Sequence, residues 1–305
     1  MSAAIDACSL SRLRLALSVL LLCMAIGAPG LSAGAAQQPQ ISVIIDDMGY
    51  GRKSGLEAVA LPGPVAYAFL PHTPYAIELA ELAHENNKEV LLHLPMQSHS
   101  GDRLGPGAVT AVMGRVDLMR VVSADLRSIP HVSGVSNHMG SLLTPRREAM
   151  GWLMDLLRVR GNLFFVDSRT TPMSTALEVA QQRRVPSTWR DVFLDNDVNE
   201  AKITRAFERL LRIARRRGTA LAIGHPNEQT LAVLASMIPR LDAYGVRLVP
   251  VAALIRTRRW DRPPFPAATR FRASSDIEDR TDYRRVHFPG DRNQSWSFGR
   301  AASTR

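Results

Sequence analysis

The sequence contains little cysteine, and both copies lie near the start of the chain. Cys8 and Cys23 are the two cysteines among 305 residues. Both lie within or before an N-terminal apolar stretch, so the remainder of the chain has none. This absence excludes disulfide bonds, thiolate metal sites and a cysteine nucleophile from that remainder. Any metal ion there must be held by histidine and carboxylate side chains.

The sequence also lacks the short motifs of several large enzyme classes. It contains no Gly-x-Ser-x-Gly elbow, Walker loop, His-Glu-x-x-His or Gly-x-Gly-x-x-Gly. Aromatic residues make up only 6% of the chain, and the basic residues of its middle part are not interleaved with them. The pattern therefore favours no nucleic-acid partner, and it specifies no oligomeric state.

The net charge of +10 belongs mostly to the C-terminal end. Residues 256–305 carry 12 basic and 6 acidic side chains, whereas residues 37–255 carry 24 and 21. The tail, 256–305, is rich in Arg and Pro and has no helical or strand period, which predicts disorder. The favoured interpretation is a solvated extension. The alternative is a basic arm for peripheral association with anionic glycans or lipid headgroups of the envelope.

The N-terminal segment has the pattern of a secretory signal peptide. Arg12 and Arg14 precede an apolar run, residues 15–28, and small residues follow it. About 14 apolar residues are fewer than the roughly 20 that span a membrane. Residues 1–36 are therefore predicted to be a cleavable signal peptide, and the protein to be exported to the periplasm or another extracytoplasmic space. An uncleaved N-terminal anchor is the alternative.

Between residues 37 and 255, short apolar runs alternate with helical patterns. Strands are expected at residues 41–45, 65–70, 90–94, 132–136, 163–166, 189–194, 219–223 and 246–251. Helical spacing occurs at residues 75–86, 116–128, 146–158, 173–183, 200–216 and 228–242. Strands that are apolar on both faces are typical of a buried parallel sheet. The alternation predicts one α/β domain, either a barrel or a doubly wound sheet.

Ionisable residues recur at the expected strands, most of them at the carboxyl ends. Those at or near such ends are Asp46, Asp47, His93, His138, Asp167 and His225, whereas Arg190 and Asp191 lie within the strand expected at residues 189–194. The carboxyl ends of parallel strands meet at one rim of a barrel or one edge of a sheet, so these groups should converge. Aspartate and histidine are suitable ligands for Zn²⁺ or a similar divalent ion, and the remaining acid and imidazole can transfer protons.

Each of these residues also has a structural interpretation. A pair such as Asp46-Asp47 after a strand is common in turns and helix caps. His93 lies in an apolar run and is consistent with a hydrogen-bonded core histidine. Asp167 with Arg169, and Arg190 with Asp191, are consistent with internal ion pairs. The argument for function rests on several strands delivering such groups to the same rim.

Six ordered motifs resemble one known family. They are Ile44-Ile45-Asp46-Asp47-Met48-Gly49, His93-Leu94-Pro95-Met96, Asn137-His138-Met139-Gly140-Ser141, Phe165-Val166-Asp167-Ser168-Arg169-Thr170, Arg190-Asp191-Val192-Phe193-Leu194-Asp195 and Ile223-Gly224-His225-Pro226. Together they resemble the divergent polysaccharide deacetylases, a branch of the NodB-like carbohydrate esterases. The resemblance implies a distorted (β/α) barrel of seven to eight mostly parallel strands over residues 37–255.

The resemblance also implies roles for particular residues. Asp46 would be the general base, His225 the general acid, and Asp167 and Arg190 would orient one of them. Where the family has His-x-x-x-His, this sequence has His93 and Gln97, so the metal ligands are assigned to Asp47, His93 and His138. Substrate contacts are assigned to Asn137, Ser168, Arg169 and Asp191.

The function implied is a hydrolase dependent on a divalent metal, expected to be Zn²⁺. It would remove acetyl groups from N-acetylated amino sugars of an envelope polysaccharide or peptidoglycan-like glycan. The missing second histidine at Gln97 favours an alternative, a catalytically inactive glycan-binding or envelope-assembly protein on the same fold.

Overall fold

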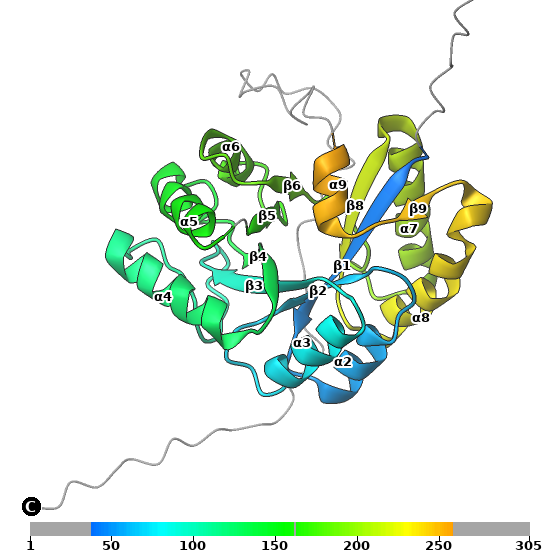
Figure 1. Ribbon diagram of the computed structural model, residues 1–305, viewed down its shortest axis with the longest axis horizontal. Coiled ribbons are helices and arrows are strands. Elements are labelled where there is room, and N and C mark those ends of the chain that lie inside the picture. Colours follow the sequence, from blue (N-terminus) through cyan, green and yellow to red (C-terminus); the bar gives the residue numbers. More distant parts are fainter. Residues whose placement is uncertain (1–37, 162, 259–305) are drawn as a thin grey trace, which may run out of the picture. The chain divides into compact units, whose positions relative to one another are not determined.

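One curved parallel sheet organises the part of the chain that the computed structural model describes, residues 38–161 and 163–258 (Figure 1). Its strands are β1 (Gln40–Met48), β2 (Ala66–Phe69), β3 (Val90–Met96), β4 (Val132–Met139), β5 (Phe164–Asp167), β6 (Ser187–Trp189), β7 (Val192–Phe193), β8 (Thr219–Gly224) and β9 (Arg247–Leu248). The predicted signal peptide, residues 1–36, and the tail from residue 259 onward lie outside the described residues.

The strand order is that of a barrel opened at one seam. It runs β6-β5-β4-β3-β2-β1-β8-β7, every pair is parallel, and β9 adds to β1. Strands β6 and β7 follow each other in the chain but form the two ends of this order. The predicted distorted (β/α) barrel is confirmed. The expected strand 189–194 is two short strands, and the last expected strand contains only Arg247–Leu248 before a helix begins.

Helices surround the outer face of the sheet, as Figure 1 shows. They are α2 (Arg52–Val59), α3 (Ala76–Glu85), α4 (Arg115–Ser128), α5 (Arg147–Val159), α6 (Ala176–Gln182), α7 (Glu200–Arg217) and α8 (Glu228–Met237), with a 3₁₀ turn, η1 (Ile238–Tyr244). Helix α7 shows why the sequence pattern succeeded. Its side chains Ile203, Phe207 and Leu210 are buried at helical spacing, and Gly218 ends it at φ 83°. Helix α2 was not predicted, because Gly55 and four polar residues hide its short apolar face.

Alternate residues of the strands divide the core into two apolar layers. The interior of the barrel is filled by side chains such as Ile44, Leu91, Val166 and Ile223. Helix α9 (Val251–Thr257), inside the curve of the sheet, adds Leu254 to this layer (Figure 1). Because apolar residues fill the middle of the barrel, polar chemistry is confined to its rims.

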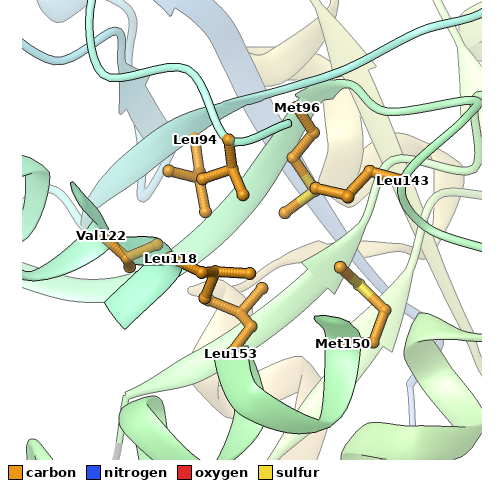
Figure 2. A pocket seen from close by; sticks show the side chains of 8 residues that line it. Leu94, Met96, Leu118, Val122, Leu143, Met150 and Leu153 are labelled. Carbon is orange, nitrogen blue, oxygen red and sulfur yellow. The ribbon is translucent and has the colours of Figure 1, made fainter. Parts of the chain in front are cut away.

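The outer layer packs the strands against the surrounding helices. Figure 2 shows one part of it, where apolar side chains of β3, α4 and α5 and the segment between β4 and α5 converge. The labelled residues are Leu94, Met96, Leu118, Val122, Leu143, Met150 and Leu153. No ionisable group lines this space in the described part of the chain. It is a packing contact that fixes the strand carrying His93, and it is separate from the strand-end residues.

A buried arginine links the two ends of the sheet. Arg258 donates a hydrogen bond to the Thr188 hydroxyl on β6, and its guanidinium also pairs with Asp191. The Asp191 carboxylate in turn accepts a hydrogen bond from the backbone N–H of Leu221 on β8. The guanidinium lies 3.6 Å from the ring centroid of Trp189. Helix α9 ends at Thr257 and Arg258 is buried, so packing continues three residues past residue 255, where the domain was predicted to end.

No helix among the described residues is both long and apolar enough to cross a membrane.

Candidate metal centre and active site

The ends of β1, β3 and β4 bring Asp47, His93 and His138 together. Oδ1 of Asp47 lies 2.9 Å from Nδ1 of His138 and 3.2 Å from Nε2 of His93. One ligand atom from each of the three residues lies within 4.8 Å of the other two. These separations are compatible with three atoms that share one ion, since zinc–ligand bonds are roughly 2 Å long.

Three residues of this rim have a strained backbone conformation. Asp47, Met139 and Arg169, at the ends of β1, β4 and β5, all have positive φ values between 52° and 56°. Residues other than glycine rarely adopt this region, and such strain is typical of functional sites. Gly49 has φ 118°, and a Cβ atom there would lie 2.1 Å from the Thr73 hydroxyl oxygen. The turn that follows Asp47 therefore requires glycine.

The polar atoms of this cluster fit a bound cation. Oδ1 of Asp47 is buried, yet it accepts no hydrogen bond from either neighbouring imidazole. A buried carboxylate oxygen without a donor is costly unless a cation occupies the space. The donor set of one carboxylate and two imidazoles is a common one for a catalytic divalent ion with an open coordination position. Asp47, His93 and His138 are therefore suited to hold such an ion.

Gln97 explains how the fold accommodates the missing second histidine. Its side-chain Oε1 accepts a hydrogen bond from the backbone N–H of Ala111, and its backbone oxygen accepts from Leu142 and Leu143. The residue therefore anchors the long loop after β3 to the segment after β4. His138 on the neighbouring strand supplies the imidazole next to Asp47 instead.

The two adjacent aspartates have opposite pKa shifts. Burial raises the pKa of Asp46, against the effect of His93 and the other imidazoles. Burial also acts to raise the pKa of Asp47, but the nearby imidazoles, His138 first among them, hold it well below its usual range. Asp46 Oδ1 is buried without a donor, and Oδ2 lies 3.6 Å from Nε2 of His93. One carboxylate is thus anionic and the other is suited to carry a proton.

His225, at the end of β8, is held by a residue that the sequence analysis did not select. Its Nδ1 lies 3.0 Å from Oδ1 of Asp195, and its Nε2 lies 3.6 Å from Oδ2 of Asp47. Burial alone would lower the pKa of His225, but Asp195, with Asp47 and Asp46, raises it to about 10. The carboxylate that orients His225 is therefore that of Asp195, not Asp167.

Asp195 is itself tightly bound. Its Oδ2 accepts hydrogen bonds from the His225 backbone N–H at 2.7 Å and from the Thr230 hydroxyl at 2.8 Å. Burial acts to raise the pKa of Asp195, but the charge of His225, together with these hydrogen bonds, lowers it. The sequence signal for Asp195 was its place two residues after a short strand. In the structure, that place is in register with His225, directly after β8. A two-residue strand, however, is too short to show which side chains face inward.

Several other predicted residues shape the rim through hydrogen bonds within the protein. Asp167 accepts from the Arg169 backbone N–H and the Ser174 hydroxyl, and burial raises its pKa. The Asn137 side chain bonds to the backbone of Ser168 and Met139.

Arg190 lies at the same rim. It donates to the backbone oxygens of Ser168 and Arg169 and lies 4.8 Å from the ring centroid of Phe193, whose ring is 5.2 Å from that of His225. Arg190 therefore forms part of the wall next to His225.

Asp191 does not join this cluster. It accepts hydrogen bonds from Leu221 and Trp189 and pairs with Arg258. Leu221 precedes His225 by four residues, which is roughly 13 Å along a strand. Asp191 therefore belongs to the polar cluster that joins the sheet ends, whereas Asp46, Asp47, His93, His138 and His225 meet at the mouth of the barrel.

The chain belongs to the divergent polysaccharide deacetylase family, whose profile matches residues 43–255. Two uncharacterized proteins are similar to this chain over most of their length. The uncharacterized protein YibQ of Escherichia coli K12 is 35% identical over 227 residues, which is 74% of this chain and 70% of that protein. An uncharacterized protein of Haemophilus influenzae Rd is 33% identical over 229 residues, 75% and 81% of the two chains.

A solved structure shares the fold. The crystal structure of the uncharacterized protein ATU2773 from Agrobacterium tumefaciens C58 has a TM-score of 0.69 and 24% identity. The match covers 72% of this chain and 90% of that one.

Proposed function

We propose that the protein is an exported metal-dependent hydrolase that removes acetyl groups from N-acetylated amino sugars of an envelope polysaccharide. The observation that carries the proposal is the meeting of Asp47, His93 and His138 around a buried carboxylate oxygen without a donor. Beside them lies an imidazole, His225, oriented by Asp195. A cation site next to positioned proton donors and acceptors is an arrangement that can catalyse amide hydrolysis.

Asp47, His93 and His138 would hold the ion. A bound divalent cation such as Zn²⁺ supplies Lewis-acid polarisation of an acyl carbonyl and makes water more acidic. His93 is oriented for this role, because its Nδ1 lies 2.7 Å from the Ser136 hydroxyl and its Nε2 faces Asp47. Such partners of a ligand fix its ring orientation.

The remaining groups move protons. Asp46 lies one residue from Asp47, and its register places it level with His225 on β8. Asp46 would take the proton of the attacking water as the carbon–oxygen bond forms. His225, charged while it is paired with Asp195, would give a proton to the amine as the carbon–nitrogen bond breaks. In this reaction water and the amide are converted into acetate and a free amine.

The proposed substrate class and the proposed location are supported by two different observations. Membership of the divergent polysaccharide deacetylases supports a glycan substrate. The charged, apolar and small-residue pattern of residues 1–36 supports export. Amino sugars in envelope glycans would then meet the enzyme outside the cytoplasm.

The test combines metal content with acetate release. The protein without residues 1–36 is purified, its metals are measured by elemental analysis, and acetate release from N-acetylglucosamine oligomers is followed. We expect about one divalent ion per chain and metal-dependent release, both lost in His138→Ala. His131→Ala is the matched control, because His131 precedes the same strand, β4, at its opposite end and is exposed.

Two results would contradict the proposal. One is wild-type protein without a stoichiometric ion after reconstitution. The other is acetate release that His138→Ala leaves unchanged. Glycan binding without turnover by metal-loaded wild type would support the inactive glycan-binding alternative instead.

A further inference from the structure

Ser168, directly after β5, has a buried hydroxyl group without a partner. The residue is 3% exposed, and its Oγ has no hydrogen bond among the described residues. Its backbone is fixed on both sides, since its N–H donates to Asn137 Oδ1 at 2.9 Å and its oxygen accepts from Arg190 Nε at 2.7 Å. The backbone is therefore held in place while the side chain remains unpaired.

Strand register directs this hydroxyl toward the metal centre. Val166, two residues earlier, packs in the interior of the barrel. Side chains alternate along a strand, so Ser168 also faces inward, one step nearer the mouth. Ser136 on β4 pairs with Val166 on β5, and this register continued by two residues sets His138 beside Ser168.

The other neutral polar side chains of this rim already have partners within the protein. They are Ser136, Asn137, Thr170, Ser174, Asn227 and Thr230. Ser168 differs from them because its hydroxyl is both buried and unpaired. An unpaired buried hydroxyl is unfavourable, so its presence at a rim points to a partner that arrives from outside.

We propose that the Ser168 hydroxyl accepts a hydrogen bond from the N–H of the substrate's scissile amide and so selects N-acetyl over O-acetyl groups. This inference rests on the proposed function. A neutral hydroxyl suits a neutral polar group, and beside His138 that group is the reacting amide, not a distant sugar hydroxyl. Sites built to bond an N–H discriminate strongly against analogues that lack it.

The experiment compares Ser168→Ala with Ser187→Ala in metal-loaded protein. Ser187 is the matched control, because it is 1% exposed and its Oγ is also unpaired. Its register partner, Phe165, packs in the outer layer, so Ser187 faces away from the mouth. The probes are an N-acetylglucosamine tetramer and an O-acetylated xylo-oligosaccharide, with zinc content and thermal midpoint measured in parallel.

We expect Ser168→Ala to lower kcat/KM on the amide probe by about tenfold or more, the effect of one lost hydrogen bond in a desolvated site. Zinc content and any turnover of the ester probe should stay within about twofold of wild type, as should all values for Ser187→Ala.

The outcomes separate this inference from the proposed function. Amide turnover by Ser168→Ala within twofold of wild type would overturn it, as would an equal loss on the ester. If wild type turns over only the amide probe, the inference requires that Ser168→Ala loses amide turnover while Ser187→Ala keeps it. If metal-loaded wild type releases acetate from neither probe, the proposed function fails and this inference fails with it.

Discussion

Two partly buried aspartates, Asp47 and Asp191, lie in clusters of similar composition that differ in completeness. Each faces several basic side chains. Both oxygens of Asp191 are paired, with Trp189 on one and with Leu221 and Arg258 on the other. Asp47 instead has a buried oxygen that accepts no hydrogen bond, although two imidazoles lie within 3.2 Å of it.

The difference shows how a structural ion pair can be distinguished from a ligand site. A buried charge whose partners are all supplied by the protein stabilises one fold and leaves no room for another molecule. A buried charge with an unpaired oxygen is stable only when something else completes it. The cluster at Asp191 joins the ends of the sheet, and the cluster at Asp47 is suited to a cation.

Replacing the ligand carboxylate should have the largest effect. Asp47→Asn removes the proposed anionic ligand, so zinc affinity should fall by more than the roughly 100-fold typical of residues that act behind the ligands. Acetate release should be lost with it. Titration calorimetry with zinc measures the affinity, and Asp191→Asn serves as the control that keeps it. If Asp47→Asn kept the zinc affinity of wild type, the Asp47 cluster would no longer differ from the Asp191 cluster as a cation site.

The reverse experiment measures stability. Asp191→Asn leaves the buried guanidinium of Arg258 without its counter-charge, so the free energy of unfolding of zinc-free protein should fall by about 3–5 kcal/mol. Urea unfolding measures it. Arg217→Gln removes an exposed partner 3.7 Å from Asp191 and should change stability by less than about 1 kcal/mol. Equal effects of the two substitutions would contradict a special role for Arg258.

A third carboxylate, Asp195, should affect turnover and leave the metal unchanged. Asp195→Asn removes the charge that orients His225, so kcat should fall by about 100-fold, within the range of general acid catalysis. Zinc affinity should remain that of wild type, because the hydrogen bonds of the Asp195 carboxylate go to His225, Asn227 and Thr230 and not to the three residues proposed to hold the ion. Thr230→Val removes one hydrogen bond to Asp195 and keeps its charge, and it should cost much less. A parallel loss of zinc would place Asp195 in the metal centre.

The smallest expected effect concerns Asp125, whose carboxylate is less completely paired than that of Asp191 and has fewer imidazole neighbours than that of Asp47. Its Oδ1 is 2.9 Å from Nε2 of His72, and its buried Oδ2 has no partner. Burial raises its pKa to about 6 from 3.8. Its contribution to stability is therefore fully present below pH 3.8 and is lost as the pH rises through about 6.

The stability of Asp125→Asn should lack this dependence. Urea unfolding between pH 4 and 7 gives the free energy of unfolding of wild type minus that of Asp125→Asn. This difference should decline as the pH rises to about 6 and then level off. A difference that stays constant with pH would contradict the raised pKa. At Asp125, one unpaired oxygen and a single imidazole thus accompany a shifted pKa. At Asp47, three imidazoles surround the carboxylate and form a site suited to an ion.

The sequence by itself determined the alternation of strands and helices and the residues that follow each strand. Hydrophobic spacing is local, so β1, β3, β4 and α7 were predicted close to their observed bounds. The same reasoning placed Asp46, Asp47, His93, His138 and His225 at strand ends, which meet in parallel sheets. It missed α2, whose apolar face is short, and it set the domain boundary three residues before the buried Arg258.

Only the tertiary structure decided which carboxylates are paired. Asp191 and Asp195 lie four residues apart around a two-residue strand, and nothing local shows that Asp191 meets Arg258 while Asp195 meets His225. Those partners come from segments 67 and 30 residues away, so their meeting depends on strand register and the closure of the barrel. Whether a buried oxygen is satisfied, and hence whether it can receive a ligand, is a property of these long-range contacts.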